Sequence, residues 1–287
     1  MTILQRATPR DAEAMEAFLA RYAATSMFLR NNLAAHGTGE QTHPHGTTFY
    51  LRTEGAGIAG IFGITNGGFL MAQAPDAPPE AWTAFAEEIK GRRVVGMTGR
   101  PVQVAACLSA TRLTLGPWAL FADEPLYHLT LADMVNMPGH VRAPVEKDRD
   151  LLEAWFTTYA LDTGQAERGD GRSDWAKARA ETAIGSEDVM ILEEDGTPLA
   201  MAGINARLPD MVQVGGVFTP DGMRGNGYAQ RATAGLLRRC AAQGVTQSVL
   251  FANNAVAARA YEALGFQHVG EYRVALLSTP RVVGAPE

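Results

Sequence analysis

One order of helices and strands occurs twice along the 287-residue chain, and this repeat is the strongest constraint on its fold. Each half begins with two helix-like segments and three strand-like runs, and it continues with helix, strand, helix and strand. The residues themselves hardly match between the halves. We therefore predict an α/β protein of two domains, residues 1–124 and 125–287, each a mostly antiparallel mixed sheet (α+β) flanked by helices.

Apolar spacing assigns the individual segments. In the first half it predicts helices at 12–22, 26–35, 78–90 and 101–112, and strands at 47–53, 57–65, 67–73, 92–97, 117–123 and 126–133. In the second half it predicts helices at 145–161 and 173–184 and from 227 and 254, and strands at 189–195, 198–207, 211–218, 246–251 and 266–277.

Composition excludes several classes of partner. The chain has 25 Lys and Arg against 31 Asp and Glu, so it has no general attraction to nucleic acid or to anionic lipid. No apolar run approaches the roughly 20 residues of a membrane span, and the first segment is amphipathic. Cys107 and Cys240 lie in helix-like stretches where they can pack as small apolar groups. We expect a cytoplasmic protein without nucleic-acid or membrane partners.

The loop MRGNGYAQ, residues 223–230, has the features of an anion-binding loop. Gly225 and Gly227 allow tight turns and close approach of a ligand, and the following helix begins with backbone N–H groups that point outward. Arg224 adds a charge that suits phosphate oxygens. A surface turn is the simpler alternative, because glycine-rich loops are common.

The same corner of the first half reads APDAPP, residues 74–79. Its three prolines lack an N–H group and its carboxylate would repel phosphate. The stretch from Arg207 to Cys240, by contrast, holds five arginines against Asp210 and Asp221. We therefore predict a single site for an anionic cofactor, in the second half.

Two motifs of the second half, taken together, resemble those of the GCN5-related N-acetyltransferase (GNAT) superfamily. The pyrophosphate motif Q/R-x-x-G-x-G/A is matched by Arg224, Gly225, Asn226, Gly227, Tyr228 and Ala229. The later motif N-x-x-A-x-x-x-Y-x-x-x-G-F is matched by Asn254, Ala257, Tyr261, Gly265 and Phe266. The resemblance covers residues 125–277. It implies a tandem GNAT protein whose first domain is a degenerate copy without the cofactor loop.

The resemblance implies where acetyl-CoA binds. In the family the cosubstrate lies between the fourth and fifth strands, so residues Val217, Phe218 and Thr219 are expected to contact pantetheine and the acetyl carbonyl, residues 224–229 the pyrophosphate, and Asn254 another part of CoA. Independently, Gly215-Gly216 permit a bulge that would part the fourth strand from its neighbour. The alternative is that these glycines only clear space for a neighbouring side chain.

Tyr261 is the candidate general acid. It lies seven residues after Asn254, two turns along one helix face. By resemblance it would protonate the departing CoA thiolate, although its spacing also fits plain core packing. Strand 211–218 contains no acid that could serve as the base. Residues 193–195 are acidic, but they read as a solvated hairpin turn, so no base is assigned.

Two further groups carry weaker hypotheses. Trp155, Phe156, Tyr159 and Trp175 could line an acceptor pocket, although their helical spacing favours core packing. His43-Pro44-His45 has no third ligand nearby in the sequence, so we expect no metal.

The sequence thus predicts an acetyl-CoA-dependent N-acetyltransferase that transfers an acetyl group directly to the amine of a small-molecule or peptide acceptor. A non-catalytic acyl-CoA-binding sensor is the alternative, because no base is evident. The acceptor and the oligomeric state stay open.

Overall fold

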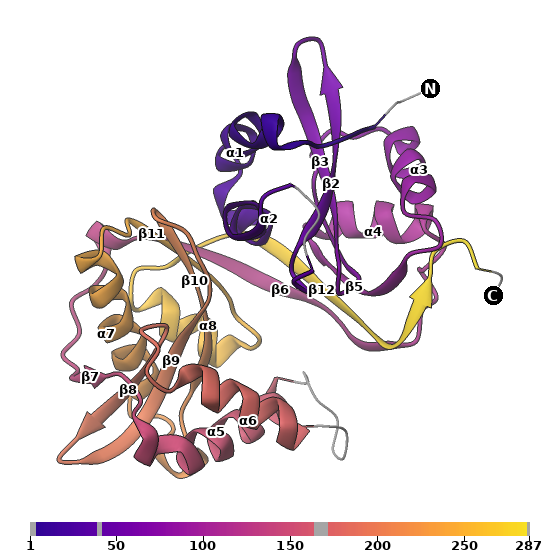
Figure 1. Ribbon diagram of the computed structural model, residues 1–287. Coiled ribbons are helices and arrows are strands. Elements are labelled where there is room, and N and C mark those ends of the chain that lie inside the picture. The colour runs from indigo at the N-terminus through magenta and orange to yellow at the C-terminus, as the bar shows by residue number, and fades with distance from the viewer. Residues whose placement is uncertain (1–3, 39–41, 164–171, 286–287) are drawn as a thin grey trace. The chain divides into compact units, whose positions relative to one another are not determined.

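The computed structural model describes residues 4–38, 42–163 and 172–285. Their contacts divide the chain into two compact units (Figure 1). Unit 1 contains residues 1–124 together with 271–287, and unit 2 contains residues 125–270.

Unit 1 is a mixed sheet between two pairs of helices. Its elements are β1 (Gln5–Arg6), α1 (Ala12–Ala20), α2 (Ala23–His36), β2 (Thr47–Glu54), β3 (Gly57–Thr65), β4 (Phe69–Gln73), α3 (Pro79–Glu88), β5 (Arg93–Gly99), α4 (Pro101–Ala110), the start of β6 (Trp118–Thr130) and most of β12 (Gln267–Val282). The strand order β1-β2-β3-β4-β5-β12 is antiparallel except for β4 and β5.

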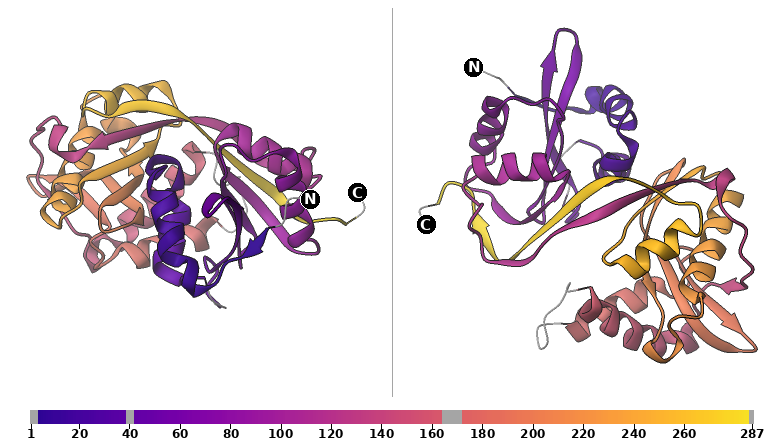
Figure 2. Two further views of the ribbon diagram at one scale, coloured as in Figure 1. Left: turned by 90° about the horizontal axis from the view of Figure 1, so that it is seen from above. Right: turned by 180° about the vertical axis from the view of Figure 1, so that it is seen from behind.

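The two faces of the unit 1 sheet bury separate apolar cores. Successive residues of a strand point to opposite faces, so Phe62 packs with α3 and α4 while Ile61 packs with α1 and α2. Both views in Figure 2 show the sheet with one helix pair on each side.

Unit 2 repeats this plan. Its elements are the end of β6, β7 (Val141–Arg142), α5 (Arg149–Asp162), α6 (Arg172–Ala183), β8 (Val189–Glu194), β9 (Thr197–Arg207), β10 (Met211–Phe218), α7 (Tyr228–Ala242), β11 (Gln247–Phe251), α8 (Ala255–Glu262) and the start of β12. The strand order β6-β11-β10-β9-β8-β7 is antiparallel except for β10 and β11.

The unit 2 core also has two layers. Met190 and Leu192 pack toward α7 and α8, whereas Ile191 between them packs toward α5 and α6. The predicted fold class, a mostly antiparallel mixed sheet flanked by helices and used twice, is therefore confirmed. None of the described helices combines the length and the apolarity needed to cross a membrane.

The chain crosses between the units in two strands that the sequence pattern does not predict to cross. The runs 117–123 and 126–133 form one continuous strand, β6, which begins in unit 1 and ends in unit 2. Strand β12 begins in unit 2, but Arg273–Leu276 pair with Gly96–Gly99 of β5 in unit 1. Residues 273–282 of β12, which are predicted from the sequence to belong to the second domain, thus pair with β5 in the sheet of the first.

This crossing makes the stability of unit 1 depend on a residue near the C-terminus. Ala275 is fully buried in the unit 1 core. We expect Ala275→Asp to destabilise unit 1 by roughly 3–5 kcal/mol, because it leaves an unpaired charge in an apolar core. Hydrogen exchange should quicken in β5 and not in β10 or β11, and Thr279→Asp at an exposed position of the same strand should change neither. Faster exchange confined to unit 2 would contradict this assignment of β12.

Candidate functional site

The fourth and fifth strands of unit 2 are paired over only part of their length. Residues 211–213 of β10 lie in parallel register with residues 247–249 of β11. Strand β10 continues to Phe218, yet the register with β11 ends at Gln213 in the described chain. One edge of residues 214–218 therefore lacks the strand partner that backbone groups in a sheet normally have.

Two consecutive glycines produce this break. Gly216 has φ +61°, a left-handed conformation that strongly favours glycine. A Cβ atom on Gly215 would overlap the side chain of Asn205 on β9. The pairing of β10 with β9 shifts register between Gly215 and Phe218. Both sequence interpretations hold, because Gly216 forms a bulge while Gly215 clears space for a neighbouring side chain.

The glycine-rich loop leads directly from this strand to α7. Gly225 and Gly227 have φ +82° and +73°, and Gly227 is the N-cap of α7. Among the described residues, no acceptor is assigned to the backbone N–H groups of residues 225–230. The loop also lies at the surface, with Gly225 and Asn226 exposed. It therefore presents a row of backbone donors at the positive end of a helix.

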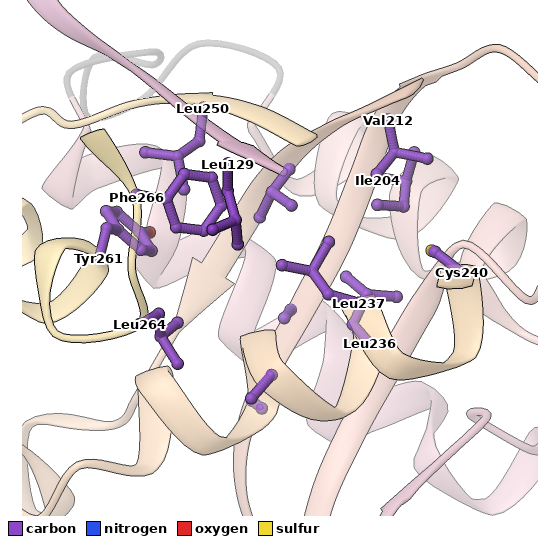
Figure 3. Packing of buried hydrophobic residues seen from close by; sticks show 14 of the residues in the cluster. Leu129, Ile204, Val212, Leu236, Leu237, Cys240, Leu250, Tyr261, Leu264 and Phe266 are labelled. Atoms are coloured by element: carbon purple, nitrogen blue, oxygen red, sulfur yellow. The ribbon is translucent and has the colours of Figure 1, made fainter. Parts of the chain in front are cut away.

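Asn254 and Tyr261 lie on α8, as the motif spacing predicts. Asn254 caps the helix, since its Oδ1 accepts hydrogen bonds from the N–H groups of Val256 (3.0 Å) and Ala257 (2.8 Å). Tyr261 is 8% exposed, and its ring packs edge-on against Phe266 with 5.9 Å between centroids (Figure 3). Burial raises the pKa of the Tyr261 hydroxyl, so it keeps its proton at neutral pH.

The hydroxyl of Tyr159, which the sequence analysis names only as a possible pocket-lining aromatic, lies at the break. The Gly216 N–H donates to Tyr159 Oη over a long 3.4 Å. Tyr159 also contributes to raising the pKa of Tyr261, so the two side chains interact electrostatically. The contact of the Tyr159 hydroxyl with β10 depends on how α5 packs against that strand. The sequence alone does not give this packing.

Known proteins resemble part of the chain in sequence and nearly all of it in structure. The model of the acetyltransferase (GNAT) family matches residues 149–266. Residues 149–266 form a GNAT domain. No curated protein sequence is significantly similar to the chain.

Solved structures of GNAT proteins share the fold over nearly the whole chain. A GNAT acetyltransferase from Colwellia psychrerythraea is 15% identical with a TM-score of 0.53, covering 95% of this chain and 99% of its own. A GCN5-related N-acetyltransferase from Kribbella flavida is 18% identical with a TM-score of 0.52, covering 91% and 96%. A tandem GNAT protein from the clavulanic acid biosynthesis pathway is 12% identical with a TM-score of 0.51, covering 100% and 99%.

In the GNAT domain, the arginines near the loop are already engaged. Arg224 Nη2 contacts Asp162 Oδ2 at 2.6 Å and Asp221 Oδ1 at 2.9 Å, and its Nε donates to the Thr219 carbonyl at 3.1 Å. The other arginines of the stretch likewise have partners, namely Arg207 with Asp188, Arg231 with Glu194, Arg239 with Glu187, and Arg238 with the carbonyls of Met137 and Gly139. The positive patch expected from the sequence is therefore largely neutralised, and Arg224 holds the loop against the end of α5.

The residues at the end of β10 include a polar atom without a partner. Val217 is half-buried, and Phe218 is buried against Trp155 with 5.9 Å between ring centroids. Thr219 is 9% exposed, and its Oγ1 is buried without a hydrogen-bond partner in the described chain. Burying a hydroxyl without a partner is unfavourable. A ligand that bonds to this atom would remove the penalty.

Unit 1 has the same break but fills it with its own side chains. Strand β4 pairs with β5 only through Phe69–Met71. Beyond it, the Ala74 N–H donates to Gln103 Oε1 at 3.0 Å, and Gln73 Oε1 accepts from the Thr25 hydroxyl at 2.8 Å. The loop that follows contains the prolines noted above. The Ala74 N–H is thus satisfied from within unit 1, although the Nε2 atoms of Gln73 and Gln103 are buried without a partner in the described chain.

The helices after the fifth strands differ at matching positions. Gln103 is the third residue of α4, where α8 has Ala257. Cys107 is the seventh residue of α4, where α8 has Tyr261. Cys107 is fully buried, and burial raises the pKa of its thiol to about 12, so it is inert as an acid or nucleophile near neutral pH. Unit 1 therefore lacks both the open position and the phenol.

Two of the three acids in the acidic turn, residues 193–195, are paired with arginines. Glu193 contacts Arg142 at 2.7 Å, and Glu194 contacts Arg231. The hydrogen bond from Arg142 holds the pKa of the Glu193 carboxyl below its usual range. These carboxylates stabilise the β8 end of the sheet and, as the sequence predicts, stand apart from any catalytic assignment.

The histidine loop gains a neighbour that its sequence spacing does not show. His36 at the end of α2 stacks on His43 with 4.3 Å between ring centroids, and His45 lies 5.4 Å from His43. In the described ranges, no group of three His, Cys, Asp or Glu side chains has the arrangement to hold a metal ion.

The cap of α8 can be tested directly. We expect Asn254→Ala to destabilise the GNAT domain by about 1 kcal/mol, because two helix N–H groups lose their acceptor. Asn254→Asp supplies an equivalent oxygen and should stay within about 0.5 kcal/mol of the natural protein. Urea unfolding monitored by circular dichroism measures both. Equal losses for the two variants would show that the amide group, and not its oxygen, matters at this cap.

Proposed function

We propose that the GNAT domain transfers an acetyl group from acetyl-CoA directly to the amine of a small-molecule or peptide acceptor. The observation that carries this proposal is the half-paired β10, which leads at once into a loop of backbone N–H donors. An extended pantetheine arm can pair with a free strand edge as an added strand does, and a diphosphate is matched by N–H groups at a helix N-terminus. No metal enters the proposal.

Each part of the cosubstrate has residues suited to it. The backbones of Val217, Phe218 and Thr219 would pair with pantetheine and direct an N–H group at the acetyl carbonyl, where charge develops. Residues 224–229 would hold the pyrophosphate through their N–H groups. In the conformation described, the Arg224 guanidinium bonds to two carboxylates, so its direct contact with phosphate would require those ion pairs to open. Asn254 would lie beside CoA while it caps α8.

The residues of the chain would contribute to transfer in three ways. The strand edge and the loop fix the thioester close to the acceptor amine. A backbone N–H near residues 217–219 stabilises the oxyanion. Tyr261, which stays protonated because of its burial, donates its proton to the departing thiolate. No side chain is assigned to take the proton of the acceptor amine, since Glu193 and Glu194 are paired with arginines and a water chain or a remote acid could serve.

The loop glycines provide the first test of this proposal. We expect Gly225→Ala to raise the Kd for acetyl-CoA about 5- to 30-fold, because a side chain in the left-handed region costs about 1–2 kcal/mol. Gly222→Ala is the matched control, since Gly222 lies in the same loop with ordinary φ and open space around it. Calorimetry should also give one acetyl-CoA per chain. A second site of similar affinity would mean that Gln103 does not block unit 1.

Tyr261 provides the second test. We expect Tyr261→Phe to lower kcat for thiol release at least 100-fold with little change in the Kd for acetyl-CoA, because the ring still packs while the proton donor is lost. Cys240→Ser at a buried position of α7 serves as a control for small polar changes in the same core. Unchanged turnover would remove Tyr261 from the mechanism. Acetyl-CoA binding without turnover of any amine would instead favour a sensor.

A further inference from the structure

Among the described residues of unit 2, Arg179 is the arginine that combines a buried nitrogen without a hydrogen-bond partner with the lack of an acid beside it, whereas Arg238, which also has no acid beside it, bonds to two backbone carbonyls. Arg142, Arg149, Arg207, Arg224, Arg231 and Arg239 each lie within 4.0 Å of a carboxylate. Arg179 on α6 has no such partner among the described residues. In the part of the chain that the structure describes, Nη2 of Arg179 bonds to the amide oxygen of Asn205 over 3.4 Å, and its Nε is buried without a partner.

The surroundings of Arg179 are apolar on the faces of its guanidinium. The guanidinium carbon lies 5.5 Å from the ring centre of Phe156 and 5.9 Å from that of Trp175. Aromatic faces partly compensate a buried cation, but they leave the N–H groups at its edge unsatisfied. Burial lowers the pKa of Arg179, although an arginine keeps its charge near neutral pH. The Arg179 guanidinium is therefore a charged group whose N–H donors can bind an anion.

Arg179 lies beside the strand segment at the centre of the proposed function. Its Nη2 is 4.0 Å from the position that a Cβ atom on Gly216 would take. Tyr159, whose hydroxyl accepts from the Gly216 N–H, also affects the pKa of Arg179. Gly216 precedes Thr219 by three residues, a distance of roughly 10 Å along a strand. An anion on Arg179 would thus lie within a few bonds of the thioester that residues 217–219 are proposed to hold.

We propose that Arg179 binds the carboxylate of the acceptor, and that the acceptors are small amines carrying a carboxylate, such as amino acids. A guanidinium fork matches a carboxylate through two parallel hydrogen bonds, and Nε is one of its two donors. Phe156 and Trp175 hold the fork in place, and Trp175, 37% exposed, borders it on the solvent side. This inference rests on the proposed function, because it names the class of acceptor at the same site.

The test compares acids with matched neutral amines. Thiol release from acetyl-CoA is measured with three series, each containing an amino acid, its carboxamide and its decarboxylated amine, built on alanine, phenylalanine and glutamine. We expect at least tenfold higher kcat/KM for the acid in the series that the enzyme accepts. Arg179→Gln should abolish that preference through KM, while its Kd for acetyl-CoA and its turnover of the carboxamide stay within twofold of the natural protein.

A matched variant separates recognition from loss of charge or of structure. Lys177→Gln removes one positive charge from an exposed position of the same helix and should leave the acid preference intact. The melting temperature of Arg179→Gln should not fall, because the variant removes a buried charge that lacks an ionic partner.

The outcomes distinguish this inference from the proposed function. Equal turnover of acids and carboxamides, or an acid preference that survives in Arg179→Gln, would overturn the role of Arg179 while amine acetylation stands. Acetyl-CoA binding with no thiol release from any member of the three series would overturn the assignment of carboxylate-bearing amines as acceptors. If a wider panel of peptides and polyamines also failed, the proposed transferase function would fall with it.

Discussion

The GNAT domain depends on the point where β10 stops pairing with β11. In a sheet, each inner strand satisfies its backbone groups on both sides, and a strand freed on one side must find other partners. In this domain the left-handed Gly216 and the side-chain-free Gly215 divert β10 just after Gln213. The bend at Gly215 and Gly216 also leads the chain into the loop before α7. The free strand edge and the row of N–H donors therefore both follow from these two glycines.

The two units show that this diversion alone does not make a site. Unit 1 has the same strand order and the same short parallel pairing of β4 with β5, yet Gln103 satisfies the Ala74 N–H from within. Where α4 has this glutamine, α8 has Ala257, whose short side chain cannot reach the strand. A single fold can therefore carry an open edge or a closed one, and side chains at a few positions decide which.

Features that depend on neighbouring residues were predictable from the sequence, whereas contacts between residues far apart in the chain were not. The helix and strand order, the left-handed glycines of the loop and the Asn254 cap all follow from patterns within about ten residues. The placement of β12 did not, because alternating apolar residues predict a strand without naming the sheet it joins. Tyr159 could be named from the sequence only as one aromatic among four, and Arg179 could not be named at all, because their spacing is that of ordinary helical packing and their position depends on how α5 and α6 pack over β10.

The partners of the charged side chains in the GNAT domain could not be predicted from the sequence either. These partners change the expected way in which the domain attracts an anion. Five arginines between Arg207 and Cys240 indicate a positive patch in the sequence, but partners from α5, from β8 and the two residues before it, and from the segment before β7 engage every one. Such exposed ion pairs add little stability, and they cancel the long-range field that would draw a polyanion from a distance. Attraction at the loop must then come from backbone N–H groups acting over hydrogen-bond distances. Recognition of acetyl-CoA would thus rely on shape and close contact. On the side of β10 where α6 packs, Arg179 is a cation without an acidic partner among the described residues.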